Sequence, residues 1–280
     1  MASSSELFCK PTELNGDSPA SRAAALLMQC RMSGVRVPRF PPELSPQDLD
    51  QGYAIQGEVA RQRGAPPGGF KIGLTSESAQ RANGSVMPIV GRLASTDIRR
   101  RPGRLLLPRS HLRIVEPEVA LEIGRDLDHL QAPFSEAMIS SIVRAAYAAL
   151  EICDARLDDE ERLAALVADN SNADLLVLGD EISEWQAADF AQWPVHIRVG
   201  DAVSRVGSPS QALGHPLKAL TWLANWLAAR GESLRAGFIV ATGSCTEFVS
   251  AAPRDVIQAN FGTQARVSIE FQPRRREVNL

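Results

Sequence analysis

The chain has 280 residues, of which 44% are hydrophobic and 22% charged, and its formal net charge is −3. This composition predicts a globular protein with a sizeable core and offers no general attraction to nucleic acid or anionic lipid. No apolar run approaches the roughly 20 residues of a membrane-spanning helix, and the N-terminus lacks the basic and apolar blocks of a secretory signal. We therefore expect a soluble, cytoplasmic protein with neither nucleic-acid nor membrane partners.

The N-terminal quarter of the chain divides into a leader and two helices. Residues 1–17 are polar and unpatterned, which predicts a disordered leader. Residues 18–67 are expected to form a helical N-terminal cap. Its first helix, 18–31, begins with Ser18 as N-cap and Pro19 at the first helical position. Its second helix begins at a capping-box variant that starts at Ser45, and the helix ends near Gly64.

Residues 68–280 are expected to form one domain, in which short β-like runs outnumber helices. Strands are predicted at 69–74, 113–123, 148–155, 175–178, 195–199, 238–242, 256–261 and 265–271, and helices at 76–82, 135–146 and 215–230. Because strands and helices do not alternate regularly, the pattern favours an α+β fold with a mixed, wrapped sheet over Rossmann or TIM topology.

The strand at 113–123 carries Glu116 and Glu118 on one face, because side chains alternate along a strand. Pro117 lies between them and predicts a sheet edge or strand end, since proline cannot donate to a ladder. Two neighbouring carboxylates repel each other unless a proton or a cation such as Mg²⁺ or Mn²⁺ intervenes. A solvent-facing acidic pair is the equally good alternative from this pair alone.

A third carboxylate, Glu151, lies in the middle of the apolar run at 148–155. A buried carboxylate is costly unless it is paired or binds a metal. A structural ion pair of Arg156 with Glu151 or Asp154 is one explanation. The other is that Glu151 joins Glu116 and Glu118 in one face of an octahedral Mg²⁺ site.

Lys71 stands alone in the apolar, glycine-flanked run Gly69-Phe-Lys-Ile-Gly-Leu-Thr-Ser76. A buried lysine suits proton transfer or the binding of an anion, whereas a lysine at a sheet edge only extends its amine to solvent. Thr75 and Ser76 are expected to cap the following helix.

The segment 241–246, Ala-Thr-Gly-Ser-Cys-Thr, follows an apolar strand and offers backbone N–H and hydroxyl donors to a carboxylate, although a plain turn has the same composition. The sequence contains no Gly-x-Ser-x-Gly motif, its histidines lack ligand spacing, and its four cysteines form no C-x-x-C pair. Serine hydrolysis and zinc bound by histidine or by cysteine pairs are therefore not indicated.

With these segments in order, the sequence resembles the 2-keto-4-pentenoate hydratases and 4-oxalocrotonate decarboxylases of the fumarylacetoacetate hydrolase superfamily. The matching pieces run colinearly from about residue 45 to 271 and are the lysine strand, the Glu116-Pro-Glu118 strand, Leu150-Glu-Ile-Cys-Asp-Ala-Arg156, Ala168-Asp-Asn-Ser171, Leu178-Gly179, Leu213-Gly-His-Pro216, Trp222-Leu-Ala-Asn225 and Ala259-Asn-Phe-Gly262.

The resemblance implies a mixed β-sandwich-like roll with a helical N-terminal cap, similar to the C-terminal domain of fumarylacetoacetate hydrolase. It also implies a homo-oligomer, with a pathway enzyme as a conceivable further partner. It places the metal ligands, for Mg²⁺ or Mn²⁺, at Glu116, Glu118 and Glu151, and the catalytic lysine at Lys71. Lys71, Leu74, Gly243 and Ser244 are the implied substrate contacts, and Ser171 lies in a shared motif without an assigned role.

The implied activity is a lyase reaction of aromatic meta-cleavage catabolism, in which water adds to a 2-hydroxy-2,4-dienoate or its 2-oxo tautomer to give a 4-hydroxy-2-oxoacid. The family's hydratases carry an acid in the loop after the lysine strand, in a Pro-Asp-aromatic-Gly pattern. In this chain the segment expected to form that loop reads Pro88-Ile89-Val90-Gly91. Ile89 favours the alternative, a 2-oxo acid decarboxylase, while the Glu116-Pro-Glu118 strand and the 243–246 segment are closer to the hydratases. A family member with redirected or lost activity, acting as a binding or assembly subunit, is the second alternative.

Overall fold

A computed structural model of the chain describes residues 18–106, 113–158 and 163–273. The predicted leader at 1–17 lies outside these residues. The helices are α1 (Pro19–Ser33), α2 (Leu49–Arg63), α3 (Glu77–Ala82), α4 (Glu136–Ile142), α5 (Leu163–Ala168) and α6 (Pro216–Ala228). No helix among the described residues is both long and apolar enough to cross a bilayer.

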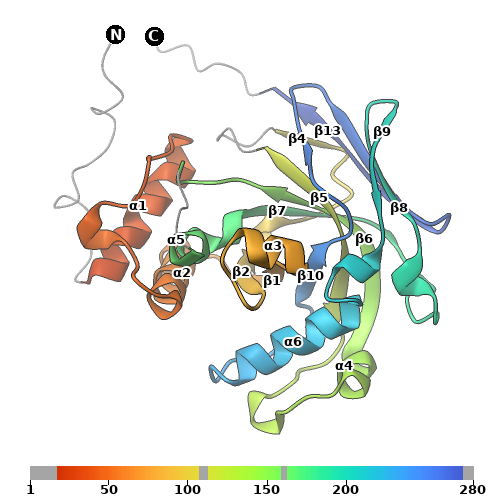
Figure 1. The fold of residues 1–280 in the computed structure, drawn as a ribbon, viewed down its shortest axis with the longest axis horizontal. Helices are drawn as coiled ribbons and strands as arrows, with labels where there is room; N and C mark the ends of the chain where they lie inside the picture. Colours follow the sequence, from red (N-terminus) through yellow and green to blue (C-terminus); the bar gives the residue numbers. More distant parts are fainter. Residues whose placement is uncertain (1–17, 107–112, 159–162, 274–280) are drawn as a thin grey trace.

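The described strands form two sheets (Figure 1). The larger sheet contains β1 (Pro67–Gly73), β2 (Ile89–Ala94), β3 (Ile98–Arg100), β5 (Ile114–Ile123), β6 (Val143–Cys153), β7 (Ala173–Glu181), β10 (Ile239–Ser244) and β11 (Val249–Ser250). The smaller sheet contains β4 (Arg104–Leu106), β8 (Val195–Val199), β9 (Ala202–Gly207), β12 (Val256–Phe261) and β13 (Ala265–Gln272). The larger sheet runs in the order β2-β1-β10-β5-β6-β7-β3, with β11 paired to β5, and β1 is parallel to β10 but antiparallel to β2. The structure is thus α+β with a mixed sheet, as the sequence predicted.

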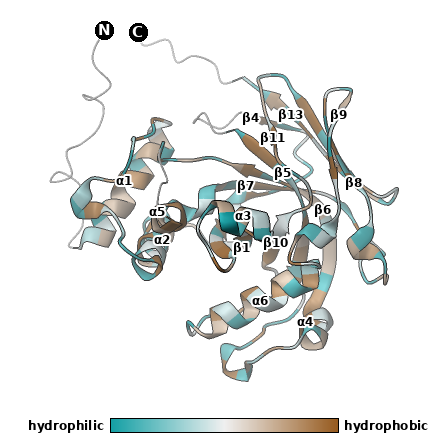
Figure 2. Ribbon diagram, viewed as in Figure 1, coloured by the Kyte–Doolittle hydropathy of each residue, from teal (hydrophilic) through white to brown (hydrophobic). Residues whose placement is uncertain are grey.

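The main core lies between the two sheets and beneath α6. Val119 and Leu150 of the larger sheet and Ile197 and Phe261 of the smaller one belong to one buried cluster. Figure 2 shows the hydrophobic residues concentrated along strands such as β5, whereas the helices carry both hydrophobic and hydrophilic residues. Since apolar burial is the main driving force for folding, this core holds the central strands in fixed register.

The N-terminal helices α1 and α2 pack with α5 beside the larger sheet (Figure 1). Gln56 of α2 is buried and donates to the carbonyl oxygens of Val90 at 2.8 Å and Val167 at 3.0 Å. The Tyr53 hydroxyl accepts a hydrogen bond from the Val90 N–H. Helix α2 therefore fixes the start of β2, which borders the lysine strand.

Three predicted elements differ from the structure. The second helix begins after Asp48, whose side chain accepts from the Gln51 N–H, so the predicted capping box at Ser45 is wrong. The helix predicted at 135–146 ends at Ile142, because the following residues pair with β5 and bury small alanines there, which overrides their helix propensity. The segment with Ile89, predicted as a loop, is the start of β2.

The edge position predicted from Pro117 is also wrong, because β5 lies between β10 and β6. Pairing of β10 with β5 ends at Ser244 opposite Glu118, and β11 pairs with β5 only at Val115 and Ile114. Pro117 falls in the gap between these two ladders. A central strand accommodates the proline there because no donor is needed from it on that side.

Candidate active site

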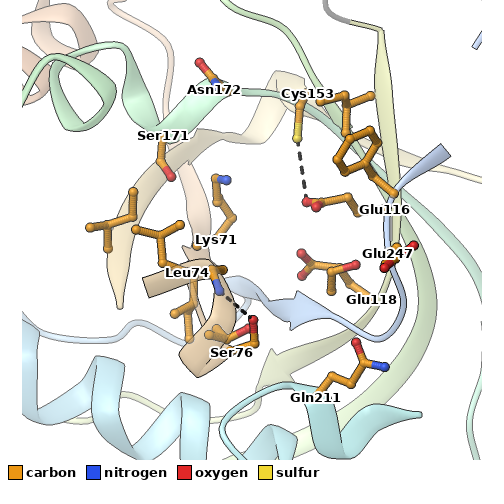
Figure 3. A pocket seen from close by; sticks show the side chains of 18 of the residues that line it. Lys71, Leu74, Ser76, Glu116, Glu118, Cys153, Ser171, Asn172, Gln211 and Glu247 are labelled. Atoms are coloured by element: carbon orange, nitrogen blue, oxygen red, sulfur yellow. Dashed lines mark hydrogen bonds between the residues drawn. The ribbon is translucent and has the colours of Figure 1, made fainter. Parts of the chain in front are cut away.

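Five of the seven proposed site residues line a cavity of about 640 Å³ at the ends of β1, β5, β6 and β10, whereas Glu151 and Gly243 are not among its lining residues. Figure 3 shows Lys71, Glu116, Glu118 and Cys153 directed toward its centre. Leu74 and Ser244 also line it. The structure therefore brings together residues from four separate regions of the sequence.

The three glutamates lie on two adjacent strands. In the antiparallel register of β5 and β6, Glu116 is directly opposite Glu151, and Glu118 is two residues further along the same face of β5. Glu118 and Glu151 are each 1% exposed, and Glu116 is partly open to the cavity. Like charges directly opposite each other on a sheet repel, so this arrangement is electrostatically unfavourable unless a proton or a cation intervenes.

Glu151 is the least satisfied member of the group. Its Oε1 lies 3.2 Å from Lys71 Nζ, yet neither carboxylate oxygen accepts a hydrogen bond from any described residue. Buried carboxylates normally have hydrogen-bond partners or bind a cation. The unmet oxygens, with the carboxylate of Glu116 directly opposite, thus fit a hard divalent cation.

The alternative ion pair of Arg156 with Glu151 is not formed. Arg156 is buried and its Nε donates to Asp169 Oδ1 at 2.5 Å, while its backbone N–H donates to the other oxygen of Asp169. Arg156 therefore stabilises the turn after α5. The cation that lies beside Glu151 is Lys71 instead.

Lys71 is 4% exposed and lies in β1 between β2 and β10, so it is not a lysine at a sheet edge. Gly91 of β2 faces it, and a Cβ there would lie 2.9 Å from Lys71 Cγ and 2.7 Å from the Asn170 carbonyl oxygen. The glycine therefore leaves the room that the lysine chain needs to reach Glu151.

The protonation states follow from burial and mutual repulsion. Burial, followed by the charge of Glu151, raises the pKa of Glu116 from 4.5 to about 7. Burial and the charges of Glu151 and Glu116 raise the pKa of Glu118 well above its ordinary value. Burial lowers the pKa of Lys71, but the nearby carboxylates, above all Glu151, raise it by more, so the amine stays protonated.

Glu118 is held by the end of β10. The Gly243 N–H donates to Glu118 Oε2 at 2.9 Å, and the neighbouring Thr242 hydroxyl donates to the Val119 carbonyl oxygen at 2.8 Å. Gly243 has a φ of 118°, and a Cβ there would lie 2.3 Å from Thr75 Oγ1. Glycine is required at this position by both backbone conformation and space.

The sequence reasoning missed one residue of the site and left another without a role. Cys153 lines the cavity and its thiol donates to Glu116 Oε2 at 3.8 Å. It lies two residues after Glu151 on the same strand, so alternation would have placed it on the same face. Ser171 also lines the cavity, from a turn in which Asn170, Ser171 and Asn172 all have positive φ.

One group of donor atoms is close enough to hold a metal ion as the structure stands. Single ligand atoms of Glu116, Glu151 and Cys153 lie within 4.8 Å of one another. Glu118 lies outside this group because Gly243 holds it. Two of the three proposed glutamates are therefore already convergent.

No protein-family model matches the chain. The chain is 33% identical over 256 residues to a TodF product hydratase of Pseudomonas putida, which covers 89% of this chain and 94% of the relative. It is 30% identical over 260 residues to a 2-keto-4-pentenoate hydratase of Paraburkholderia xenovorans, with 89% and 94% covered. It is also 30% identical over 239 residues to a 4-oxalocrotonate decarboxylase of Pseudomonas putida, with 82% and 87% covered.

Solved structures show the same fold. The 4-oxalocrotonate decarboxylase from Pseudomonas putida G7, complexed with magnesium and adipate, superposes with a TM-score of 0.82 at 24% identity, covering 90% of this chain and 97% of that one. Its complex with calcium and acetate gives the same TM-score, covering 92% and 98%.

Proposed function

The chain belongs to the family of the 2-keto-4-pentenoate hydratases and 4-oxalocrotonate decarboxylases, within the fumarylacetoacetate hydrolase superfamily, and is therefore a lyase; we propose that it adds water to a 2-hydroxy-2,4-dienoate or its 2-oxo tautomer in a divalent-metal-dependent reaction. The observation that carries the proposal is that Lys71, Glu116 and Glu118 line one cavity, while the buried Glu151 lies 3.2 Å from Lys71 Nζ and directly opposite Glu116.

Glu116, Glu118 and Glu151 are the residues that would hold Mg²⁺ or Mn²⁺. When bound, the ion supplies positive charge beside the C1 carboxylate and C2 oxygen of a 2-oxo acid. A bound cation would also offset the burial and repulsion that raise the pKa values of Glu116 and Glu118. The magnesium and calcium complexes of the structurally similar decarboxylase are consistent with a divalent cation.

Lys71 is the proton-bearing group of the site. Its Nζ holds a proton beside Glu151 Oε1, so it suits proton donation to a substrate carbon or binding of the substrate carboxylate. In the reaction the dienol loses the proton of its C2 hydroxyl and gains one at C5. Water then adds across C3 and C4, with its oxygen at C4 and its proton at C3.

The cavity wall around these groups restricts the substrate to a small acid. Leu74, Ile72 and Ile89 are apolar lining residues, whereas Ser171 and Ser244 present hydroxyl groups. We propose Leu74, Gly243 and Ser244 as substrate contacts. In the unliganded structure the Ser244 hydroxyl donates to the Thr246 carbonyl oxygen, so substrate binding would require that this bond be exchanged.

Decarboxylation of a 4-oxalocrotonate-type acid is the second candidate, and Ile89 is the observation that favours it. The side chain is 1% exposed and lines the cavity where the family's hydratases carry an acid. An isoleucine can neither orient water nor move its proton. The same carboxylates and lysine would instead serve loss of CO₂ from the vinylogous keto acid.

Separate incubation with the two substrates tests the proposal. With Mg²⁺ present, we expect turnover of 2-hydroxypenta-2,4-dienoate to 4-hydroxy-2-oxopentanoate, followed by loss of dienol absorbance and by product mass. Release of CO₂ from 4-oxalocrotonate without turnover of the dienoate would reject hydration. Assembly as a homo-oligomer, a complex with a pathway enzyme and a cytoplasmic location stay predictions.

A further inference from the structure

Cys153 adds a sulfur atom to the carboxylate cluster. It follows Glu151 by two residues on β6 and shares its face of the sheet. Its Sγ lies 3.8 Å from Glu116 Oε2 (Figure 3). One ligand atom each of Glu116, Glu151 and Cys153 lie within 4.8 Å of one another. The side chain is 5% exposed and lines the cavity, so a bound ion would reach it without rearrangement of the strand.

A second observation shows that this group lacks a ligand. Both oxygens of the buried Glu151 are without a hydrogen bond from the described residues, and Lys71 at 3.2 Å is the charged group that faces them. Glu118, by contrast, already accepts from the Gly243 N–H. Glu116 and Glu151 therefore form a convergent donor set with the sulfur of Cys153, and a second, all-oxygen set would form if Glu118 joined the same two carboxylates.

The two donor sets differ in the ions they prefer. Mg²⁺ takes oxygen ligands in octahedral geometry, whereas Zn²⁺ and its heavier relative Cd²⁺ accept thiolate readily. We propose that Cys153, Glu116 and Glu151 form a binding site for a thiophilic divalent cation of the zinc class, which competes with Mg²⁺ for the two shared carboxylates. On binding, the S–H bond of Cys153 breaks, a metal–sulfur bond forms and the proton passes to solvent.

That Cys153 is a ligand is inferred from its position beside Glu116 and Glu151. Only the competition with Mg²⁺ rests on the proposed function. Since one cation neutralises Glu116 and Glu151, a second is disfavoured by charge repulsion in the same cavity. Occupation by Zn²⁺ or Cd²⁺ therefore excludes Mg²⁺, and we expect these ions to inhibit the Mg²⁺-dependent reaction. The hydration proposed above uses Lys71 and the three glutamates but not Cys153, which makes the inference separately testable.

Cadmium binding to the metal-free protein is the direct test. We expect one equivalent of Cd²⁺ to produce an ultraviolet sulfur-to-metal charge-transfer band. Cys153→Ser should abolish the band and weaken Cd²⁺ binding by calorimetry at least about tenfold, while Mg²⁺ affinity stays unchanged. Cys30→Ala is the matched control, because Cys30 is a buried cysteine packed among the N-terminal helices outside the cavity, and it should retain the band. Persistence of the band in Cys153→Ser, or an equal loss of Mg²⁺ and Cd²⁺ affinity, overturns the proposal.

X-ray absorption of the wild-type protein with one equivalent of Zn²⁺ keeps the test independent of the variants' folding. We expect one sulfur neighbour at about 2.3 Å together with oxygen neighbours at about 2.0–2.2 Å. A shell of oxygen or nitrogen alone overturns the proposal. Displacement of the Cd²⁺ band by excess Mg²⁺ supports competition, and a band insensitive to Mg²⁺ overturns it. Absence of lyase turnover with the Cd²⁺ band intact rejects the proposed function and leaves the sulfur ligand standing.

Discussion

Replacing Glu116 with glutamine should stabilise the metal-free protein at high pH. Glu116 faces Glu151 across β5 and β6, and its pKa is raised from 4.5 to about 7 by burial and by that charge. The folded state therefore retains a proton over this range that the unfolded chain has lost. By linkage, the free energy of unfolding falls as pH rises from 4.5 to about 7 and stays reduced above it.

The size of this effect follows from the same pKa. A rise from 4.5 to about 7 corresponds to about 3 kcal/mol of lost stability, since one pKa unit is about 1.4 kcal/mol. Water in the cavity solvates Glu116 in part, so we expect about 1 to 3 kcal/mol. Glutamine cannot ionise, and Glu116→Gln should therefore exceed the wild type in stability by that amount above pH 7, with no difference from this source below pH 4.5.

Denaturant unfolding in a chelator, repeated across this pH range, measures the difference. Addition of Mg²⁺ should then raise the stability of the wild type, because the ion binds only the folded state, and should have little effect on Glu116→Gln. Glu181→Gln is the matched control, since Glu181 is an exposed carboxylate of the same sheet, and it should behave as the wild type. If Glu116→Gln is less stable than the wild type above pH 7 in chelator, or gains as much from Mg²⁺, the electrostatic account of the site is wrong.

Three further variants test other parts of the account. Lys71→Met should retain Mg²⁺ binding by calorimetry but lower kcat by about 100-fold or more, because the proton-bearing group is lost; a wild-type kcat would exclude Lys71 from the chemistry. Gly243→Ala should weaken Mg²⁺ binding and lower the free energy of unfolding by about 1 to 3 kcal/mol, because the φ of Gly243 is 118° and the new Cβ would lie 2.3 Å from Thr75 Oγ1. Unchanged Mg²⁺ affinity and an unchanged melting temperature would contradict this interpretation. Asp169→Ala should destabilise the fold by about 3 to 5 kcal/mol in denaturant unfolding, because it leaves the Arg156 guanidinium buried without its partner; a loss below about 1 kcal/mol would show that the pair is dispensable.

The charged residues of the site could be identified from sequence because they interrupt apolar strands. Glu151 and Lys71 each stand in a run of buried residues, and the structure shows them paired at 3.2 Å. Cys153 was missed because a thiol in such a run reads as one more apolar residue. Its chemistry emerged only when the register of β5 and β6 placed Glu116 beside it.

Features that depend on distant segments were predicted less well. The partner of Arg156 is Asp169, after α5, rather than Glu151, which is closer in the sequence. Pro117 indicated an edge strand, but the gap between β10 and β11 allows it in the centre of the sheet. The start of β6 at Val143 was likewise not predicted, because the helix propensity of its alanines is overridden only by pairing with β5.

The position of a bound ion tests the central claim most directly. We would determine a crystal structure with Mn²⁺ and oxalate, using anomalous scattering to locate the metal. The account predicts one Mn²⁺ with carboxylate oxygens of Glu116, Glu118 and Glu151 as ligands, oxalate in the remaining positions and Lys71 Nζ within hydrogen-bond distance of the oxalate or of Glu151. A metal bound elsewhere, or a cavity in which the three glutamates share no ion at saturating Mn²⁺, would contradict it.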